Sequence, residues 1–208
     1  MKIKKTYEYA LSKESLEKDI DQFIREAKNG AYQFDYKYEM EGLKIIKAYF
    51  RMIEDEFKKQ NFEVARACYK KLMFLLLQCD CNYFDYEDIV GKLNFDKFIV
   101  NYFTCIINLC SVEELFSEYL QYLNVKKEYG FESAHETLIS LLSKDKLAKF
   151  KSLVEKNAEN VKEKDYALYD CIYFLLDLAK FNKDKKQYNE ICDKYKYFVG
   201  EEQKGEFN

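Results

Sequence analysis

The chain has 208 residues, enough for one domain that buries a hydrophobic core without needing disulfides or a metal. It has no proline and only 6 glycines, the residues that break helices and build hairpin turns, so an all-β fold is disfavoured and an all-α fold is predicted. Its 34 basic and 37 acidic residues are interspersed and give a net charge of −3, so we expect neither nucleic acid nor a membrane as partner.

Apolar residues recur at three- and four-residue spacing through the first part of the chain, which indicates amphipathic helices. The first helix is expected to run from Ser12, its N-cap, to Gly30, the left-handed residue that ends it. Two further stripes, 43–57 and 62–76, are separated by a short polar turn in which Asn61 is the expected N-cap. Stripes joined by so few residues are predicted to pack as an antiparallel hairpin.

The connection 79–94, CDCNYFDYEDIVGKLN, differs in composition from the hairpin before it and holds four acids and three aromatic residues. Long connections often carry function. The partner-binding residues predicted here are Tyr83, Phe84, Asp85, Glu87 and Asp88. The acids of 80–88 can also coordinate a hard cation, or they can cap a short helix over 86–93 by meeting its unpaired amides.

Polar residues that stand directly before apolar stripes mark the helices of the second half of the chain. The expected capping residues are Asn94, Ser111, Ser133, Ser143 and Asp165. The serines at 111 and 133 are each followed three residues later by glutamate, the capping-box pattern. Two of the predicted helices span 95–110 and 166–181, and Gly200 is expected to end the last one. The chain is thus predicted to form one domain over 1–200, with about 9–10 helices in stacked hairpins of TPR-like or α-solenoid type, and a frayed tail over 201–208.

His135 is the only histidine, so any histidine-based catalysis must use it. It has no second histidine at zinc-site spacing, and the second position after a capping serine normally faces solvent, so no catalytic residue is predicted. Cys79 and Cys81 resemble half of a zinc set whose other half is missing, so no metal site and no cofactor are predicted. The seven cysteines are an odd number and fall mostly on apolar stripes, as reduced thiols do in cytoplasmic proteins.

Three segments together resemble a known family: FEVARACYKKL in the hairpin, YFDYEDIVGKL in the connection, and SVEELFSEYLQYL followed by EYGFES. They are similar to the helical region that accompanies SWIM zinc-finger domains in bacterial proteins of unassigned function. The zinc finger itself is absent, since no Cys-x-His follows Cys79 and Cys81. Although it lacks their glycine and terminal proline, the hairpin also resembles tetratricopeptide repeats, through Tyr49, Phe62, Ala65 and Tyr69. Both resemblances imply an interaction scaffold.

Three hypotheses about function follow from these patterns. The first is a non-enzymatic helical-repeat module that binds a protein or peptide in the groove between hairpins or along the edge formed by 83–88. The second is a small metal-dependent enzyme or factor that uses the acidic connection 80–88. The third is an inhibitor or immunity-type protein that blocks one partner by electrostatic fit.

Overall fold

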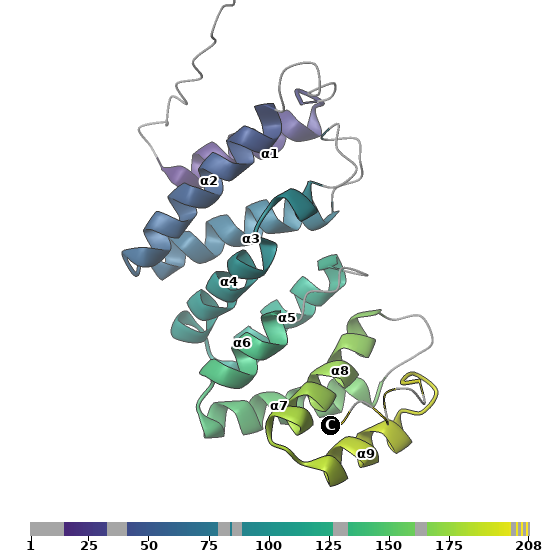
Figure 1. Cartoon of the computed structure of the whole chain (residues 1–208). Helices are drawn as coiled ribbons and strands as arrows, with labels where there is room; N and C mark the ends of the chain where they lie inside the picture. The colour runs from purple at the N-terminus through teal and green to yellow at the C-terminus, as the bar shows by residue number, and fades with distance from the viewer. Residues whose placement is uncertain are drawn as a thin grey trace, which may run out of the picture. The chain divides into compact units, whose positions relative to one another are not determined.

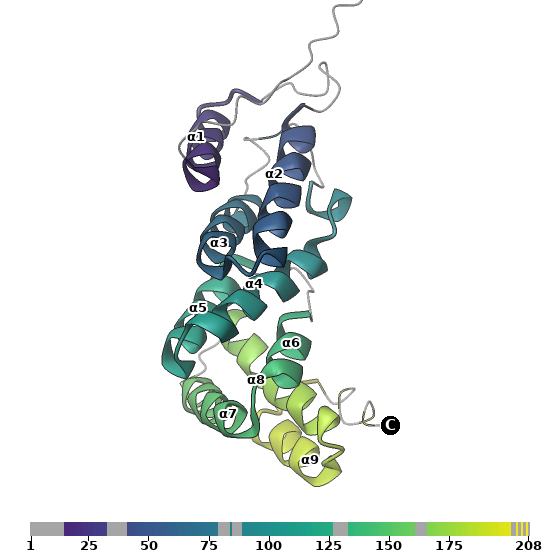
Figure 2. The ribbon, with the colours of Figure 1, turned by 90° about the vertical axis from the view of Figure 1, so that its left-hand side faces the viewer.

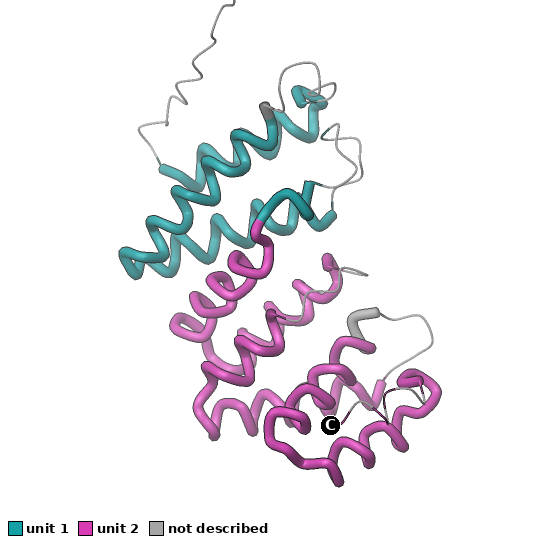
Figure 3. Tube along the Cα trace, in the orientation of Figure 1, with its two compact units in different colours: residues 1–93 teal, residues 94–208 magenta. Residues whose placement is uncertain are grey.

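The computed structural model describes residues 15–32, 41–78, 84, 89–126, 133–160 and 166–200, together with 203, 205 and 207. Within these ranges the regular structure consists of nine α-helices and a short 3-10 helix, without a strand, so the predicted all-α fold is confirmed (Figure 1). None of the helices in the described ranges combines the length and apolarity needed to cross a membrane. The chain divides into two compact units, 1–93 and 94–208 (Figure 3), and the single domain expected over 1–200 stays a prediction.

The first unit contains the predicted hairpin. Its described elements are α1 (Leu16–Lys28), α2 (Glu41–Lys58), α3 (Phe62–Gln78) and the 3-10 helix η2 (Val90–Lys92). The helix α3 packs against both α1 and α2, because its apolar side chains cover more than one face. The predicted stripes are buried where the helices meet, among them Phe50 and Ile53 of α2 and Tyr69 and Leu72 of α3. Burial of these stripes is what holds the hairpin together.

The start of α1 differs from the prediction. Its N-cap is Ser15, whose backbone is extended and whose Oγ accepts a hydrogen bond from the amide of Lys18 at 3.3 Å. The predicted cap, Ser12, lies outside the described residues. Ser15 stands directly before the first buried turn, and its oxygen is therefore in reach of an unpaired amide. The end of the helix is as predicted, with Gly30 at a left-handed φ of 82°.

In the turn between α2 and α3, the left-handed position holds a residue other than glycine. Gln60 has a φ of 63°. Its amide donates to the carbonyl of Phe57 at 2.9 Å, and the amide of Asn61 donates to the carbonyl of Glu56 at 3.0 Å. This is the Schellman arrangement, in which the left-handed position normally holds glycine because Cβ clashes there.

Gln60→Gly is therefore expected to raise the free energy of unfolding by about 0.5–1 kcal/mol, since the relief of backbone strain exceeds the extra chain entropy of glycine. Urea denaturation followed by circular dichroism measures the change. Gln60→Ala is the control, because it also removes the polar side chain but keeps Cβ. An equal gain from both substitutions would show that the backbone conformation is not the cause.

The second unit consists of six α-helices across its described residues. They are α4 (Phe95–Leu109), α5 (Val112–Lys126), α6 (Ser133–Leu141), α7 (Lys144–Ala158), α8 (Tyr166–Phe181) and α9 (Lys185–Lys194). The helix α6 contacts α4 on one side and α8 on the other, so these three form a row, while α5 contacts α7. Figure 2 shows α5 and α7 on the left of this unit and α6 on the right. The helix α9 packs against α8.

Several predicted caps of the second unit are confirmed, namely those at Asn94, Ser111 and Ser143. The capping box at the start of α5 is complete: the amide of Ser111 donates to the Glu114 carboxylate at 2.8 Å, and the amide of Glu114 donates to Ser111 Oγ at 3.3 Å. The helix α8 has the predicted bounds, although Asp165, its expected cap, lies outside the described residues.

The capping box predicted at Ser133 is wrong. Ser133 is already a helical residue of α6, and the hydroxyl of Thr137 donates to its carbonyl at 2.6 Å. The Oγ of Ser133 is buried and has no hydrogen-bond partner, so it does not cap the helix. Because α6 lies between α4 and α8, most of its side chains are buried, including that of His135, which was expected to face solvent.

The end of the chain also differs from the prediction. The last helix, α9, ends at Lys194 with Tyr195 as its C-cap, and Gly200 does not end it. The hydroxyl of Tyr188 in α9 donates to the carbonyl of Gln203 at 2.9 Å, and the ring of Phe207 lies 5.1 Å from the ring of Tyr188. Gln203 and Phe207 therefore contact α9, and the frayed tail expected over 201–208 stays a prediction.

Candidate functional site

Only one of the five residues predicted to bind a partner is described by the structure. Phe84 is 1% exposed, and its ring lies 6.0 Å from each of the rings of Phe23 and Tyr32. In this position it contributes to the core of the first unit. The other four lie outside the described residues: Tyr83, Asp85, Glu87 and Asp88. Whether the acids of 80–88 form a site or cap a helix therefore stays a prediction.

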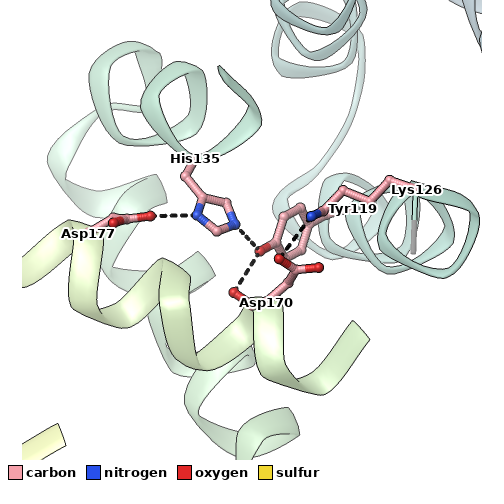
Figure 4. Close-up of polar contacts among 5 residues, drawn as sticks. All are labelled: Tyr119, Lys126, His135, Asp170 and Asp177. Atoms are coloured by element: carbon pink, nitrogen blue, oxygen red, sulfur yellow. Dashed lines mark hydrogen bonds and ion pairs between the residues drawn. The ribbon is translucent and has the colours of Figure 1, made fainter. Parts of the chain in front are cut away.

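A chain of polar side chains crosses the second unit from its interior to its surface (Figure 4). The hydroxyl of Tyr119 in α5 lies 2.9 Å from Nε2 of His135 in α6. Nδ1 of His135 lies 2.7 Å from Oδ2 of Asp177 in α8. Tyr119 and His135 are buried, whereas the side chain of Asp177 is 37% exposed. The three helices therefore bring a surface carboxylate into contact with a buried imidazole.

A buried ion pair lies beside this chain. Nζ of Lys126, in the last turn of α5, lies 3.0 Å from Oδ1 of Asp170 in α8, and the two side chains are only 7% and 16% exposed. Asp170 and Asp177 are two helical turns apart, so they lie on the same side of α8. The oxygen of the Tyr119 hydroxyl also lies 3.5 Å from the backbone carbonyl oxygen of Asp170.

Burial sets the protonation of the groups around this chain. It raises the pKa of the Tyr119 hydroxyl well above its usual value, so the side chain is a neutral donor. Burial also raises the pKa of the Asp170 carboxyl, against the opposing effect of the Lys126 charge. With Nδ1–H of His135 donating to the carboxylate of Asp177, a neutral imidazole leaves Nε2 to accept the Tyr119 proton. Both ring nitrogens then have partners.

The order of these groups differs from that of a catalytic triad. In a Ser-His-Asp triad the hydroxyl faces the substrate and the carboxylate is buried. Here the hydroxyl of Tyr119 is buried and the carboxylate of Asp177 faces the surface. The polar chain of Tyr119, His135 and Asp177 is therefore not a triad of this kind, and the two contacts of His135 hold the carboxylate of Asp177 in one position.

The described cysteines pack as small apolar residues. Four of them are buried, at Cys68, Cys105, Cys171 and Cys192. Burial raises the pKa of the Cys68 thiol to about 12, so it stays protonated at neutral pH. Cys79 and Cys81 lie outside the described residues. Across the part of the chain that the structure describes, no group of three His, Cys, Asp or Glu side chains is placed to hold a metal ion.

An open recess of about 340 Å³ lies between α6 and α8, beside the exposed end of the polar chain. Its lining residues are Glu136, Ile139 and Ser140 of α6 and Asp177, Lys180 and Phe181 of α8. The ring of Phe181 is 62% exposed, which is unusual for a large apolar side chain. The recess thus combines an apolar wall with carboxylates, one of which is held by His135.

No protein-family model, no curated protein and no solved structure matches this chain. The resemblance to the helical region that accompanies SWIM zinc-finger domains therefore stays a prediction. The function proposed below therefore rests on the structure of the second unit.

Proposed function

We propose that this protein is a non-enzymatic interaction module of TPR-like type, which binds a peptide or an extended protein segment across the row formed by α4, α6 and α8. In stacked helical hairpins the first helix of each pair packs against the first helix of the next, and together they form an extended binding surface. The contacts of α6 with α4 and with α8 support this arrangement.

The observation that carries the proposal is the recess between α6 and α8, which lies within this row. Two exposed aromatic side chains support the same surface. Tyr173 and Phe181 are each four residues from Asp177, so they lie on the stripe of α8 that lines the recess, and both are exposed. Exposed apolar side chains beside a recess are typical of protein-binding surfaces.

Selection of random peptides displayed on phage, with the purified full chain as bait, tests this function. Peptides are expected to be enriched, and Phe181→Ala is expected to weaken binding of the selected peptides by about ten-fold or more, because an exposed aromatic residue at a recess is a typical hot spot. Fluorescence polarisation with a labelled selected peptide measures the affinity.

The matched control is Tyr197→Ala, which removes an aromatic ring that is 86% exposed and lies beyond α9, outside the row. It should leave the affinity unchanged. If no peptide is enriched, or if both substitutions weaken binding equally, the row is not the binding surface.

A further inference from the structure

We propose that the recess between α6 and α8 binds an arginine side chain of the partner, with the carboxylate of Asp177 as its anchor. This inference rests on the proposed function and assigns a ligand chemistry to its surface. It follows from the charge of the recess, the support behind Asp177 and the exposed ring of Phe181.

The charges that line the recess favour a cation. The charged residues of the lining are two acidic ones, Glu136 and Asp177, and one basic one, Lys180. Nζ of Lys180 lies 5.5 Å from the centre of the Tyr188 ring in α9, so its charge is drawn toward that ring. The hydroxyl of Ser140 donates to the carbonyl of Glu136 at 2.6 Å, so its proton is committed to the backbone of α6. The lining therefore carries one more negative than positive charge.

The carboxylate of Asp177 is held in position before a ligand arrives. Nδ1–H of His135 donates to one of its oxygens at 2.7 Å, and Nε2 of the same ring is held by the Tyr119 hydroxyl at 2.9 Å. A carboxylate can accept about four hydrogen bonds, so the contact with His135 leaves capacity for a ligand. A fixed anchor costs less side-chain entropy on binding than a mobile one.

The apolar part of the recess distinguishes arginine from a simple point charge. The guanidinium group is planar, pairs with carboxylates through two parallel hydrogen bonds and stacks on aromatic faces. Phe181 supplies an exposed ring and Ile139 an apolar surface for the methylene groups of the side chain. Ligand pockets have volumes of roughly 300–1,000 Å³. The recess, at about 340 Å³, is at the small end of this range and is large enough for one side chain of a ligand and the residues next to it.

Titration of the isotope-labelled full chain with short peptides, followed by amide chemical shifts in NMR spectra, tests the assignment. The probes are acetylated and amidated pentapeptides with arginine, lysine or glutamine between alanines. The arginine peptide is expected to shift amides of α6 and α8 in a saturable way, with a Kd on the order of 1 mM. The lysine peptide should bind more weakly, and the glutamine peptide about ten-fold more weakly.

Asp177→Asn is the test variant, because asparagine keeps an oxygen that accepts the His135 proton but loses the charge. It should weaken the arginine peptide about ten-fold while the thermal unfolding temperature stays near that of the parent protein. Glu190→Gln is the control: it removes one negative charge from an exposed side chain of α9, outside the recess, and should leave the affinity unchanged.

The outcomes separate this inference from the proposed function. Equal affinities for the arginine and glutamine peptides, or an Asp177→Asn variant that binds arginine like the parent, would overturn the carboxylate anchor. Shifts confined to other helices, or no shift with any pentapeptide, would overturn the recess as an arginine site. The phage-display selection tests the proposed interaction function separately, because peptides without a basic residue can also be selected.

Discussion

Phe150→Ala is expected to lower the free energy of unfolding by about 3–5 kcal/mol, the largest effect of any single truncation we propose. The ring of Phe150 is completely buried at the centre of the second unit. It makes edge-to-face contacts with Phe116 at 5.7 Å, Tyr119 at 5.5 Å and Phe174 at 5.3 Å between ring centres. Truncation to alanine leaves a cavity that the three neighbouring rings of α5 and α8 cannot fill. The loss of stability is therefore the transfer free energy of the removed ring plus the cost of the cavity.

Urea denaturation measures this loss, and Phe181→Ala is its control. The same atoms are removed, but from a ring that is mostly exposed, so the free energy of unfolding should change by no more than about 0.5 kcal/mol. Similar losses from both substitutions would mean that Phe181 is buried in solution, and the recess would then not be open. The control also ensures that the binding effect of Phe181→Ala is not a folding effect.

Lys126→Met is expected to cost about 3–5 kcal/mol at pH 7, because it leaves the carboxylate of Asp170 buried without its partner. Methionine keeps most of the apolar stem of lysine, so the loss in free energy of unfolding comes mainly from removing the charge. Urea denaturation at pH 7 gives the value. The double variant Lys126→Met, Asp170→Asn should recover much of the stability, because no unpaired charge remains. If the double variant is as unstable as the single one, the cost comes from packing and the ion pair is not its cause.

The pH dependence of this variant has a definite sign. Burial raises the pKa of Asp170 above its ordinary value of 3.8, and the loss of the lysine charge raises it further. The folded variant therefore binds a proton more tightly than the unfolded chain does, and its stability falls as pH rises through the folded-state pKa. The difference in stability between Lys126→Met and the parent protein should accordingly be largest at pH 7 and shrink as the pH is lowered toward 3.8.

Much of the fold follows from patterns within single helices. The bounds of α8 match the predicted 166–181, and the stripe that begins after Asn61 coincides with α3. The capping box of Ser111 and Glu114 forms as predicted. Each of these features depends on residues no more than a turn or two apart, whose interaction is set by helix geometry alone.

The failed predictions concern helices whose surroundings matter more than their own sequence. Ser133 and Glu136 have the capping-box spacing, yet Ser133 is helical and its Oγ has no hydrogen-bond partner. A capping pattern states only that a hydrogen bond is available, and tertiary packing decides whether the helix begins there. The same packing buries His135 between α4 and α8, although its position after serine suggested a surface residue.

The sequence by itself determined the all-α class, most helix boundaries and the buried faces, because periodicity and capping act between neighbours along the chain. It could not indicate the contacts of Tyr119 with His135 or of His135 with Asp177, which are 16 and 42 residues apart and lie on three different helices. The recess between α6 and α8 likewise exists only once the two helices pack. Such contacts depend on how whole helices are placed against one another, and only the tertiary structure decides that placement.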